Sequence, residues 1–234
     1  MKNNYLHILF DLDQTLWDFK KNSLDVINKL FLELELEKHG IKNIDSFIEI
    51  YKPVNDGLWA NYRAGKIDKL ELNRNRFINT LKEFCDVSES LGTRMADLYI
   101  KYSPENVTLF PDAEIILEYL SAKYELHIIT NGFREIQIPK LKSSGLEKYF
   151  KEFVFSEDAG CLKPDKRFFE YFINKVGAKK EDCIVIGDDP ESDILGAANA
   201  GIKQIWLNQN TNKIPMKVKA TYTIKSLKEI RDIL

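Results

Sequence analysis

The sequence predicts an α/β protein in which a doubly wound parallel sheet carries an inserted helical domain. Two observations favour the sheet: short apolar runs alternate with helical patterns, and polar residues gather where several of these runs end. A third observation favours the insertion, because the segment after the first run has helical spacing and no convincing strand. The expected boundaries are 1–16 with 107–234 for the α/β domain and 17–106 for the helical cap.

The α/β part is expected to alternate strands and helices along its whole length. Its first strand is the apolar run 5–10, which is too short to span a membrane. The later strands are expected at 126–130, 153–155, 183–187, 204–207 and 222–224. Helices are expected at 112–123, 134–144, 166–176 and 191–200, followed by a last helix capped by Ser226. Such repetition is typical of βαβ units and predicts parallel strands.

Four helices are expected in the inserted segment, at about 24–40, 45–65, 68–84 and 88–102. Asp45 and Asp68 are placed to cap the second and third helices. Pro53 should kink or interrupt the second helix, and Gly65 should end it. An insertion at this point of the chain is expected to lie over the strand ends like a lid.

Composition narrows the class of protein. The 234 residues are 44% hydrophobic, enough for a sizeable core, and the net charge of -2 argues against binding to a nucleic acid polymer. Three cysteines without C-x-x-C spacing argue against a disulfide framework or a zinc site. We find no signal peptide and no run near the ~20 apolar residues of a membrane span. The sequence therefore predicts a cytoplasmic protein without a membrane partner, monomeric or a small homo-oligomer.

Asp11 and Asp13 follow the first expected strand and are two positions apart. Ligands of open parallel sheets bind outside the carboxyl ends of the strands, so both carboxylates are placed to face a substrate. One aspartate can attack phosphorus and carry the phosphoryl group. The other can protonate the leaving oxygen and later activate water. Alone, such a pair is more often a helix cap or a turn.

Two further motifs supply groups that suit a phosphate. Thr130, Asn131 and Gly132 end the second expected strand, and their hydroxyl, amide and backbone N–H groups can hold phosphate oxygens. Lys163 precedes Pro164, which favours an extended backbone, and its ammonium can offset the charge of a nucleophile and a phosphate. Taken singly, the first motif is more often a strand-to-helix turn, and the second is more often a solvated lysine before a helix.

Four acids follow the most apolar expected strand within six residues. Mg²⁺ prefers oxygen ligands and usually takes one or two protein carboxylates, so Asp188 opposite Asp11 would complete a Mg²⁺ site. Asp189 and Asp193 are interpreted as supporting groups or helix caps. Glu191 is interpreted as a partner of the dipole at the start of a helix.

The four motifs D-x-D-x-T, T-N-G, K-P-D and G-D-D-x-x-x-D occur in that order. In this respect the sequence resembles the haloacid-dehalogenase-like (HAD) hydrolase superfamily, over 5–16 and from about 110 to the C-terminus. The resemblance implies a Rossmann-like core and a helical cap between the first two motifs. It implies Asp11 as nucleophile and Asp13 as general acid/base, with Thr130 and Lys163 as catalytic partners. It also implies Mg²⁺ held by Asp11, by the backbone carbonyl of Asp13 and by Asp188.

A closer resemblance is to the house-cleaning pyrimidine 5′-nucleotidases of bacteria, carried by the stretches 130–135, 160–165, 191–197 and 206–208. It implies a small phosphorylated metabolite, in the first place a nucleoside 5′-monophosphate, hydrolysed through an aspartyl-phosphate. Thr130, Asn131, Gly132 and Lys163 are then expected to bind the phosphate. Trp17 and Phe133 are expected to approach the rest of the substrate, because they flank the first two motifs.

Several alternatives remain open from the sequence. A sugar-phosphate or phosphoglycolate-type phosphatase, or a phosphomutase, would share the same motifs. A 2-haloacid dehalogenase would need neither the acid at Asp13 nor a metal. A non-catalytic phospho-receiver would have no reason for Asp13 at this spacing, nor for a large cap.

Overall fold

A computed structural model describes residues 5–84, 89–209 and 218–234. The chain forms two compact units: Met1–Lys20 with Val107–Leu234, called here the α/β unit, and Lys21–Asn106, called the helical unit. Residues 17–20, which were expected to begin the cap, belong to the α/β unit. The expected start of the fourth helix at Ser88 lies outside the described residues.

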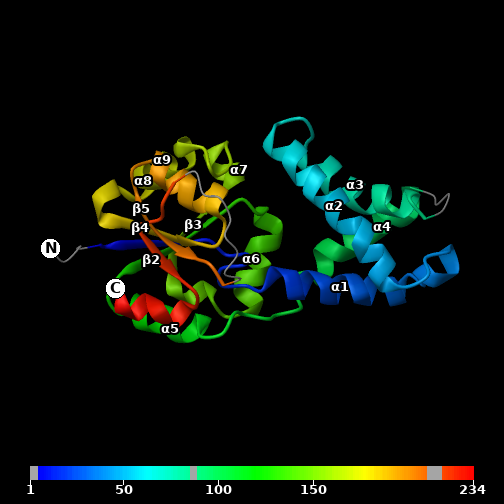
Figure 1. The fold of residues 1–234 in the computed structure, drawn as a ribbon, viewed down its shortest axis with the longest axis horizontal. Helices are drawn as coiled ribbons and strands as arrows, with labels where there is room; N and C mark the ends of the chain where they lie inside the picture. Colours follow the sequence, from blue (N-terminus) through cyan, green and yellow to red (C-terminus); the bar gives the residue numbers. More distant parts are fainter. Residues whose placement is uncertain (1–4, 85–88, 210–217) are drawn as a thin grey trace. The chain divides into compact units, whose positions relative to one another are not determined.

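Six strands of the described chain form one parallel sheet in the order β3-β2-β1-β4-β5-β6 (Figure 1). Their bounds are β1 His7–Phe10, β2 Glu125–Thr130, β3 Phe150–Phe155, β4 Cys183–Gly187, β5 Lys203–Leu207 and β6 Tyr222–Ile224. The prediction of a doubly wound parallel sheet is confirmed. The third strand begins three residues earlier than expected, because Phe150 pairs with Leu126 across a register shift.

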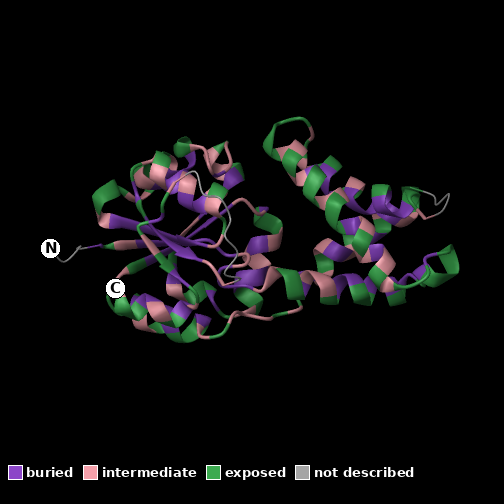
Figure 2. Cartoon of the chain, in the orientation of Figure 1, coloured by how far each residue is buried: buried purple, intermediate pink, exposed green. Residues whose placement is uncertain are grey.

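Helices cover both faces of this sheet (Figure 1). They are α5 Ala113–Ser121, α6 Arg134–Ser143, α7 Ser156–Ala159, α8 Lys166–Val176 and α9 Gly196–Asn199, with a 3₁₀ helix Leu227–Asp232 near the C-terminus. Side chains alternate along β1, so Ile8 and Phe10 pack in a core with α5, while Leu9 packs in a core with α8. Burial on both faces makes the strands the most buried elements (Figure 2).

The helix expected at 191–200 is not one continuous α-helix. Residues Pro190–Leu195 form a π-helical turn, and α9 follows it. Asp189 caps this segment by accepting hydrogen bonds from the backbone N–H groups of Glu191 and Ser192, as expected for a cap. The wider turn brings the Asp193 carboxylate back to the Asp189 N–H at 3.2 Å. Single π turns inside helices are frequent at functional sites.

The helical unit contains α1 Phe19–Glu33, which begins in the α/β unit, and α2 Ile44–Arg63, α3 Lys69–Lys82 and α4 Glu89–Tyr102. Asp68 caps α3 as expected, in a capping box with Glu71. One expectation was wrong. Asn43, not Asp45, caps α2, because its side chain accepts the Ser46 N–H at 2.9 Å. At Pro53 the helix is not interrupted, because this exposed proline removes only one hydrogen bond of a long helix; a kink there stays a prediction.

The core of the helical unit is a cluster of aromatic and aliphatic side chains from all four helices. Phe47, Tyr51 and Phe77 lie in it, with ring centroids 5.4–6.1 Å apart along the series. None of the helices in the described ranges is long and apolar enough to cross a membrane.

Candidate active site

The candidate site lies at the carboxyl ends of three neighbouring strands of the α/β unit. β1 pairs with β2 on one side and with β4 on the other, so the residues at their ends meet. Asp11 follows β1, Thr130 ends β2 and Asp188 follows β4. The Asp11 backbone N–H donates to the Ile186 carbonyl at 2.9 Å, which extends the ladder by one bond and fixes where Asp11 leaves the sheet.

Lys163 is the buried cation of this site, with 1% of its surface exposed. Its Nζ lies 2.8 Å from Asp11 Oδ1, 2.6 Å from Asp193 Oδ1 and 3.0 Å from the Ile129 carbonyl, so all three ammonium protons have acceptors. Asn131 holds the Lys163 backbone from both sides: its amide accepts the Lys163 N–H at 2.9 Å and donates to the Lys163 carbonyl at 3.0 Å.

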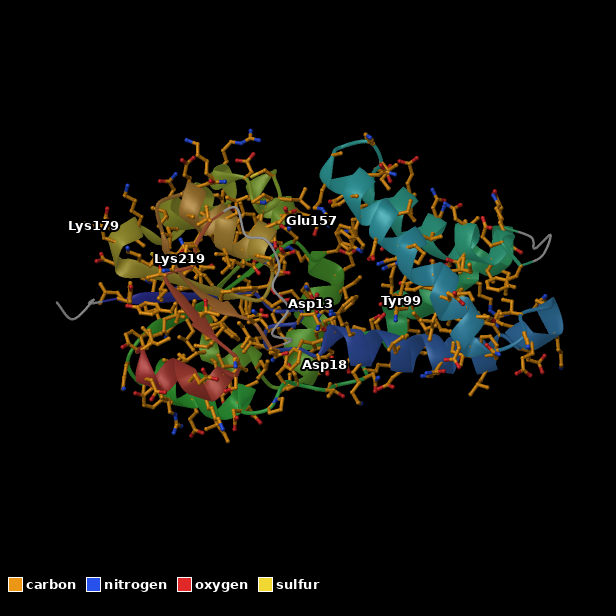
Figure 3. The ribbon with its side chains drawn as sticks, viewed as in Figure 1. Asp13, Asp18, Tyr99, Glu157, Lys179 and Lys219 are labelled. Atoms are coloured by element: carbon orange, nitrogen blue, oxygen red, sulfur yellow. The ribbon has the colours of Figure 1, made fainter. Side chains whose placement is uncertain are left out.

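Asp13 has a separate set of partners from α6, beside which it lies (Figure 3). Lys140 Nζ donates to Asp13 Oδ1 at 2.7 Å, and Gln137 Nε2 donates to Asp13 Oδ2 at 2.8 Å. Gln137 and Lys140 are buried, whereas the Asp13 side chain keeps 28% of its surface exposed. The two aspartates that the sequence placed together are thus held by different cations, and Asp13 is the more open one.

Thr130 is linked to the same network. Its Oγ1 accepts hydrogen bonds from the Gly132 backbone N–H and from Gln137 Nε2, each at 3.0 Å. With both acceptor positions used, the hydroxyl proton is left to donate. A Cβ at position 132 would collide with the Gln137 amide, which explains why a glycine follows Asn131.

Asp11 also belongs to a group of three neighbouring carboxylates. Asp11, Asp188 and Asp193 offer ligand atoms that all lie within 4.8 Å of one another. Thr15 Oγ1 lies 3.4 Å from both Asp11 Oδ2 and Asp188 Oδ1, at the limit of a hydrogen bond. A Cβ at Gly187 would collide with the Asp193 carboxylate, so glycine at the end of β4 lets this group approach.

Burial and mutual repulsion act on these groups. Burial raises the pKa of Asp11 to about 7, with Lys163 opposing the rise and the charges of Asp193 and Asp13 adding to it. Burial also raises the pKa of Asp188 to about 8, and the charge of Asp11 adds to this. Burial disfavours the charged form of Lys163, but attraction to Asp11 and Asp193 outweighs it and raises its pKa.

This donor set fits a hard divalent cation. When ionised, three carboxylates face the single ammonium of Lys163, and a cation would relieve their repulsion. Both carboxylate oxygens of Asp193 have donors, Lys163 Nζ at 2.6 Å and the Asp189 N–H at 3.2 Å, whereas Asp11 gives Lys163 only its Oδ1. Asp11 and Asp188 are therefore the carboxylates available for a metal. Two carboxylates with room for water are what Mg²⁺ usually takes from a protein.

Sequence reasoning missed Gln137 and Lys140. The only signal is that two polar residues three positions apart share a face of the helix after Thr130-Asn131-Gly132. Trp17 and Phe133, expected near the substrate, are buried to 0% and 2% exposure, and Trp17 packs in the core with α5. Neither offers an open aromatic face in this structure, and their part in binding stays a prediction.

The fold and these motifs define a HAD-type hydrolase. Residues 8–207 match the family "Haloacid dehalogenase-like hydrolase", and the chain belongs to that family. It is 32% identical to pyrimidine 5′-nucleotidase YjjG of Escherichia coli, over 97% of this chain and 96% of that protein. It is 33% identical to pyrimidine 5′-nucleotidase PynA of Streptococcus pneumoniae, over 98% and 95% of the two chains.

Solved structures agree with the fold. The structure of the HAD-hydrolase YfnB of Bacillus subtilis, bound to magnesium, covers 99% of both chains at 31% identity with a TM-score of 0.87. A 2-haloacid dehalogenase of Pseudomonas syringae is 23% identical with a TM-score of 0.70, which shows a shared fold alone.

Proposed function

We propose that this protein is a Mg²⁺-dependent phosphomonoesterase that works through an aspartyl-phosphate on Asp11. The observation that carries the proposal is the division of partners between the two aspartates. Asp11 is buried against Lys163, whereas Asp13 is held by Gln137 and Lys140 and stays partly exposed. One carboxylate is positioned to react and the other to exchange protons with leaving group and water.

In the first half-reaction, an Asp11 carboxylate oxygen attacks phosphorus while the bond from phosphorus to the ester oxygen breaks. Asp13, which enters as the acid, gives its proton to that departing oxygen. In the second half, Asp13 takes a proton from water as the water oxygen attacks phosphorus. The bond between phosphorus and Asp11 breaks, phosphate leaves, and both carboxyl groups return to their starting protonation.

Lys163 and Thr130 stabilise the phosphoryl group in this proposal. The Lys163 ammonium, fixed by its three acceptors, acts through its positive charge, and the Thr130 hydroxyl has its proton free to donate to a phosphoryl oxygen. Groups fixed in this way stabilise charge without reorganising during the reaction. Asn131 contributes by fixing the Lys163 backbone, and direct phosphate contacts from Asn131 and Gly132 stay predictions.

Mg²⁺ would be held by Asp11 and Asp188, with the backbone carbonyl of Asp13 as a further ligand. When bound, it would offset the charge of the phosphoryl oxygens and of the buried carboxylates. Asp193 acts through Lys163 and is not proposed as a ligand.

The proposed substrate is a nucleoside 5′-monophosphate. Support comes from two relatives named pyrimidine 5′-nucleotidases, which match nearly the whole chain at 32% and 33% identity. The helical unit is proposed to act as the cap that chooses the substrate, because Lys163 and Asp188 are proposed to interact only with the phosphate of the substrate or with the metal. The cytoplasmic location and a monomeric or small homo-oligomeric state stay predictions.

The test is phosphate release from a panel of uridine 5′-monophosphate, thymidine 5′-monophosphate, glucose 6-phosphate and phosphoglycolate, with and without Mg²⁺. We expect release that requires Mg²⁺ and is fastest with the nucleotides. Faster release from a sugar phosphate would refute the nucleotidase assignment while keeping the phosphatase. Halide release from 2-chloropropionate without phosphate release from any ester would refute the phosphatase.

A further inference from the structure

A second group of metal-binding side chains lies where β1 and β2 begin, at the sheet edge opposite Asp11. His7 opens β1, and Glu125 and His127 are the first and third residues of β2. The register pairs His7 with Glu125 and Leu9 with His127, so the three side chains share the sheet face that α8 covers. Figure 3 shows the two ends of this unit, marked by Lys179 at the strand starts and Asp13 at the strand ends.

The three side chains converge on one point. His7 Nδ1 lies 3.2 Å from His127 Nε2 and 3.4 Å from Glu125 Oε2, and ligand atoms of all three lie within 4.8 Å of one another. Four ligands at 2.0–2.1 Å around tetrahedral Zn²⁺ are separated from each other by about 3.3–3.4 Å. The two measured separations are close to this ligand spacing.

Hydrogen bonding explains this arrangement less well. His7 Nδ1 can carry one proton, yet it faces both the other imidazole and the carboxylate, and 3.4 Å is long for a hydrogen bond. His127 is 1% exposed, and Nε2 is the ring nitrogen that lies toward His7. The other nitrogen, Nδ1, has no hydrogen-bond partner among the described residues. In the tautomer that carries its proton on Nδ1, Nε2 has a lone pair to give to a metal.

The surroundings hold the imidazole in place and leave the carboxylate reachable. The Phe172 ring packs edge-on against His127 with centroids 4.8 Å apart. Glu152, opposite His127 in the sheet, is paired with Lys175 at 2.9 Å and so is engaged elsewhere. The Glu125 side chain is 57% exposed, which gives an ion access from solvent and leaves room for a water ligand.

We propose that His7, His127 and Glu125 form a binding site for a divalent transition metal of the Zn²⁺ type, separate from the acidic site at Asp11. Two imidazoles and one carboxylate are a ligand set that Zn²⁺ accepts with water in the fourth position. The absence of C-x-x-C spacing, which argues against a cysteine zinc site, does not argue against this one, because none of its ligands is a cysteine. By joining the starts of β1 and β2, the metal would stabilise the folded α/β unit in proportion to its occupancy.

The experiment titrates Zn²⁺ into the untagged 234-residue chain by calorimetry, with Mg²⁺ in excess to occupy the carboxylates at Asp11. Co²⁺ serves as a second probe, since its visible d–d absorption reports tetrahedral coordination. We expect one equivalent of Zn²⁺ to bind and to raise the melting temperature. His7→Gln and Glu125→Gln should each weaken binding at least about tenfold, the order found for disturbed metal sites.

Matched controls are His39→Gln and Glu181→Gln, which change an exposed residue of the same type elsewhere and should leave binding unaltered. If His7→Gln fails to fold, Glu125→Gln alone tests the proposal, because the Glu125 side chain is largely exposed and its substitution should leave the fold intact. Two outcomes would overturn the proposal: a wild type that binds no Zn²⁺, or Zn²⁺ binding that survives both substitutions and is lost in Asp188→Asn.

Discussion

The two units of this chain both bury positive charge, but they satisfy it with different partners. In the α/β unit, Lys163 contacts two aspartates at 2.8 and 2.6 Å, and Lys140 contacts Asp13 at 2.7 Å. In the helical unit, Arg76 is 4% exposed and donates to the Asn73 side chain at 2.7 Å. No carboxylate pairs with Arg76 among the described residues.

Aromatic rings complete the surroundings of Arg76. Its guanidinium carbon lies 4.7 Å from the centroid of the Tyr99 ring and 5.5 Å from that of Phe77. Burial raises the pKa of the neighbouring Tyr51, with the charge of Arg76 opposing this rise. Neutral partners and π faces can stabilise a guanidinium inside a core. The contrast teaches that, among the described residues, the ion pairs of buried cations lie where the proposed chemistry occurs, while the helical unit packs its buried Arg76 against neutral groups.

The largest effect should follow from removing the proposed nucleophile of the α/β unit. Asp11→Asn keeps the shape of the side chain but cannot form the aspartyl-phosphate, so turnover should fall about 10⁴-fold or more. Phosphate release under saturating substrate measures this, with circular dichroism to check the fold. Asp97→Asn, an exposed change on α4, is the control. Activity near that of the wild type would exclude the covalent mechanism.

The second-largest effect should be a loss of folding stability when Lys163 is replaced. Lys163→Met leaves Asp11 and Asp193 buried without their partner, and an uncompensated buried charge costs about 3–5 kcal/mol. Denaturant unfolding without added metal measures the change. Lys166→Met removes an exposed lysine of α8 and should cost under about 1 kcal/mol. Equal effects of the two substitutions would show that the buried pairs do not stabilise the fold.

The matching change in the helical unit should cost less. Arg76→Met leaves only neutral acceptors without a donor, which is worth about 1–3 kcal/mol, because no carboxylate loses a counter-charge. The same unfolding measurement compares it with Lys163→Met, and exposed Arg74→Met on α3 is the control. A loss as large as that of Lys163→Met would contradict the contrast between the two units.

The smallest effect should come from loosening Asp13. Lys140→Gln removes one of its two holding groups and should slow hydrolysis of a nucleotide about tenfold, because a misoriented acid protonates the leaving oxygen poorly. Hydrolysis of p-nitrophenyl phosphate should fall less, since its leaving group is already acidic. Exposed Lys142→Gln on the same helix is the control. Identical losses with both esters would argue that Lys140 serves the fold and not the proton transfer.

Much of the fold could be predicted from the sequence, because it depends on local patterns. Apolar runs of strand length between amphipathic helices indicate parallel βαβ units, and parallel strands place their carboxyl ends at one edge. This reasoning brought Asp11, Thr130, Lys163 and Asp188 to one site. In the structure Lys163 contacts Asp11, Thr15 lies between Asp11 and Asp188, and Thr130 is linked through Gln137 to Asp13. The cap of α2 was misjudged, because several polar residues compete for a helix start.

Only the tertiary structure decided which side chains of the site form hydrogen bonds and ion pairs with one another. The contacts of Asp13 with Gln137 and Lys140 span more than a hundred residues of sequence, and they depend on how α6 is rotated against the sheet. The pairing of Asp193 with Lys163 depends in the same way on the π-helical turn after β4. Burial of Trp17, and the approach of His7 to His127 across two strands, depend likewise on packing and register.

The sequence determined which reactive side chains the site contains and at which edge of the sheet they lie, because both follow from local periodicity. Their partners were decided by packing between distant segments, whose contacts leave no periodic trace in the sequence.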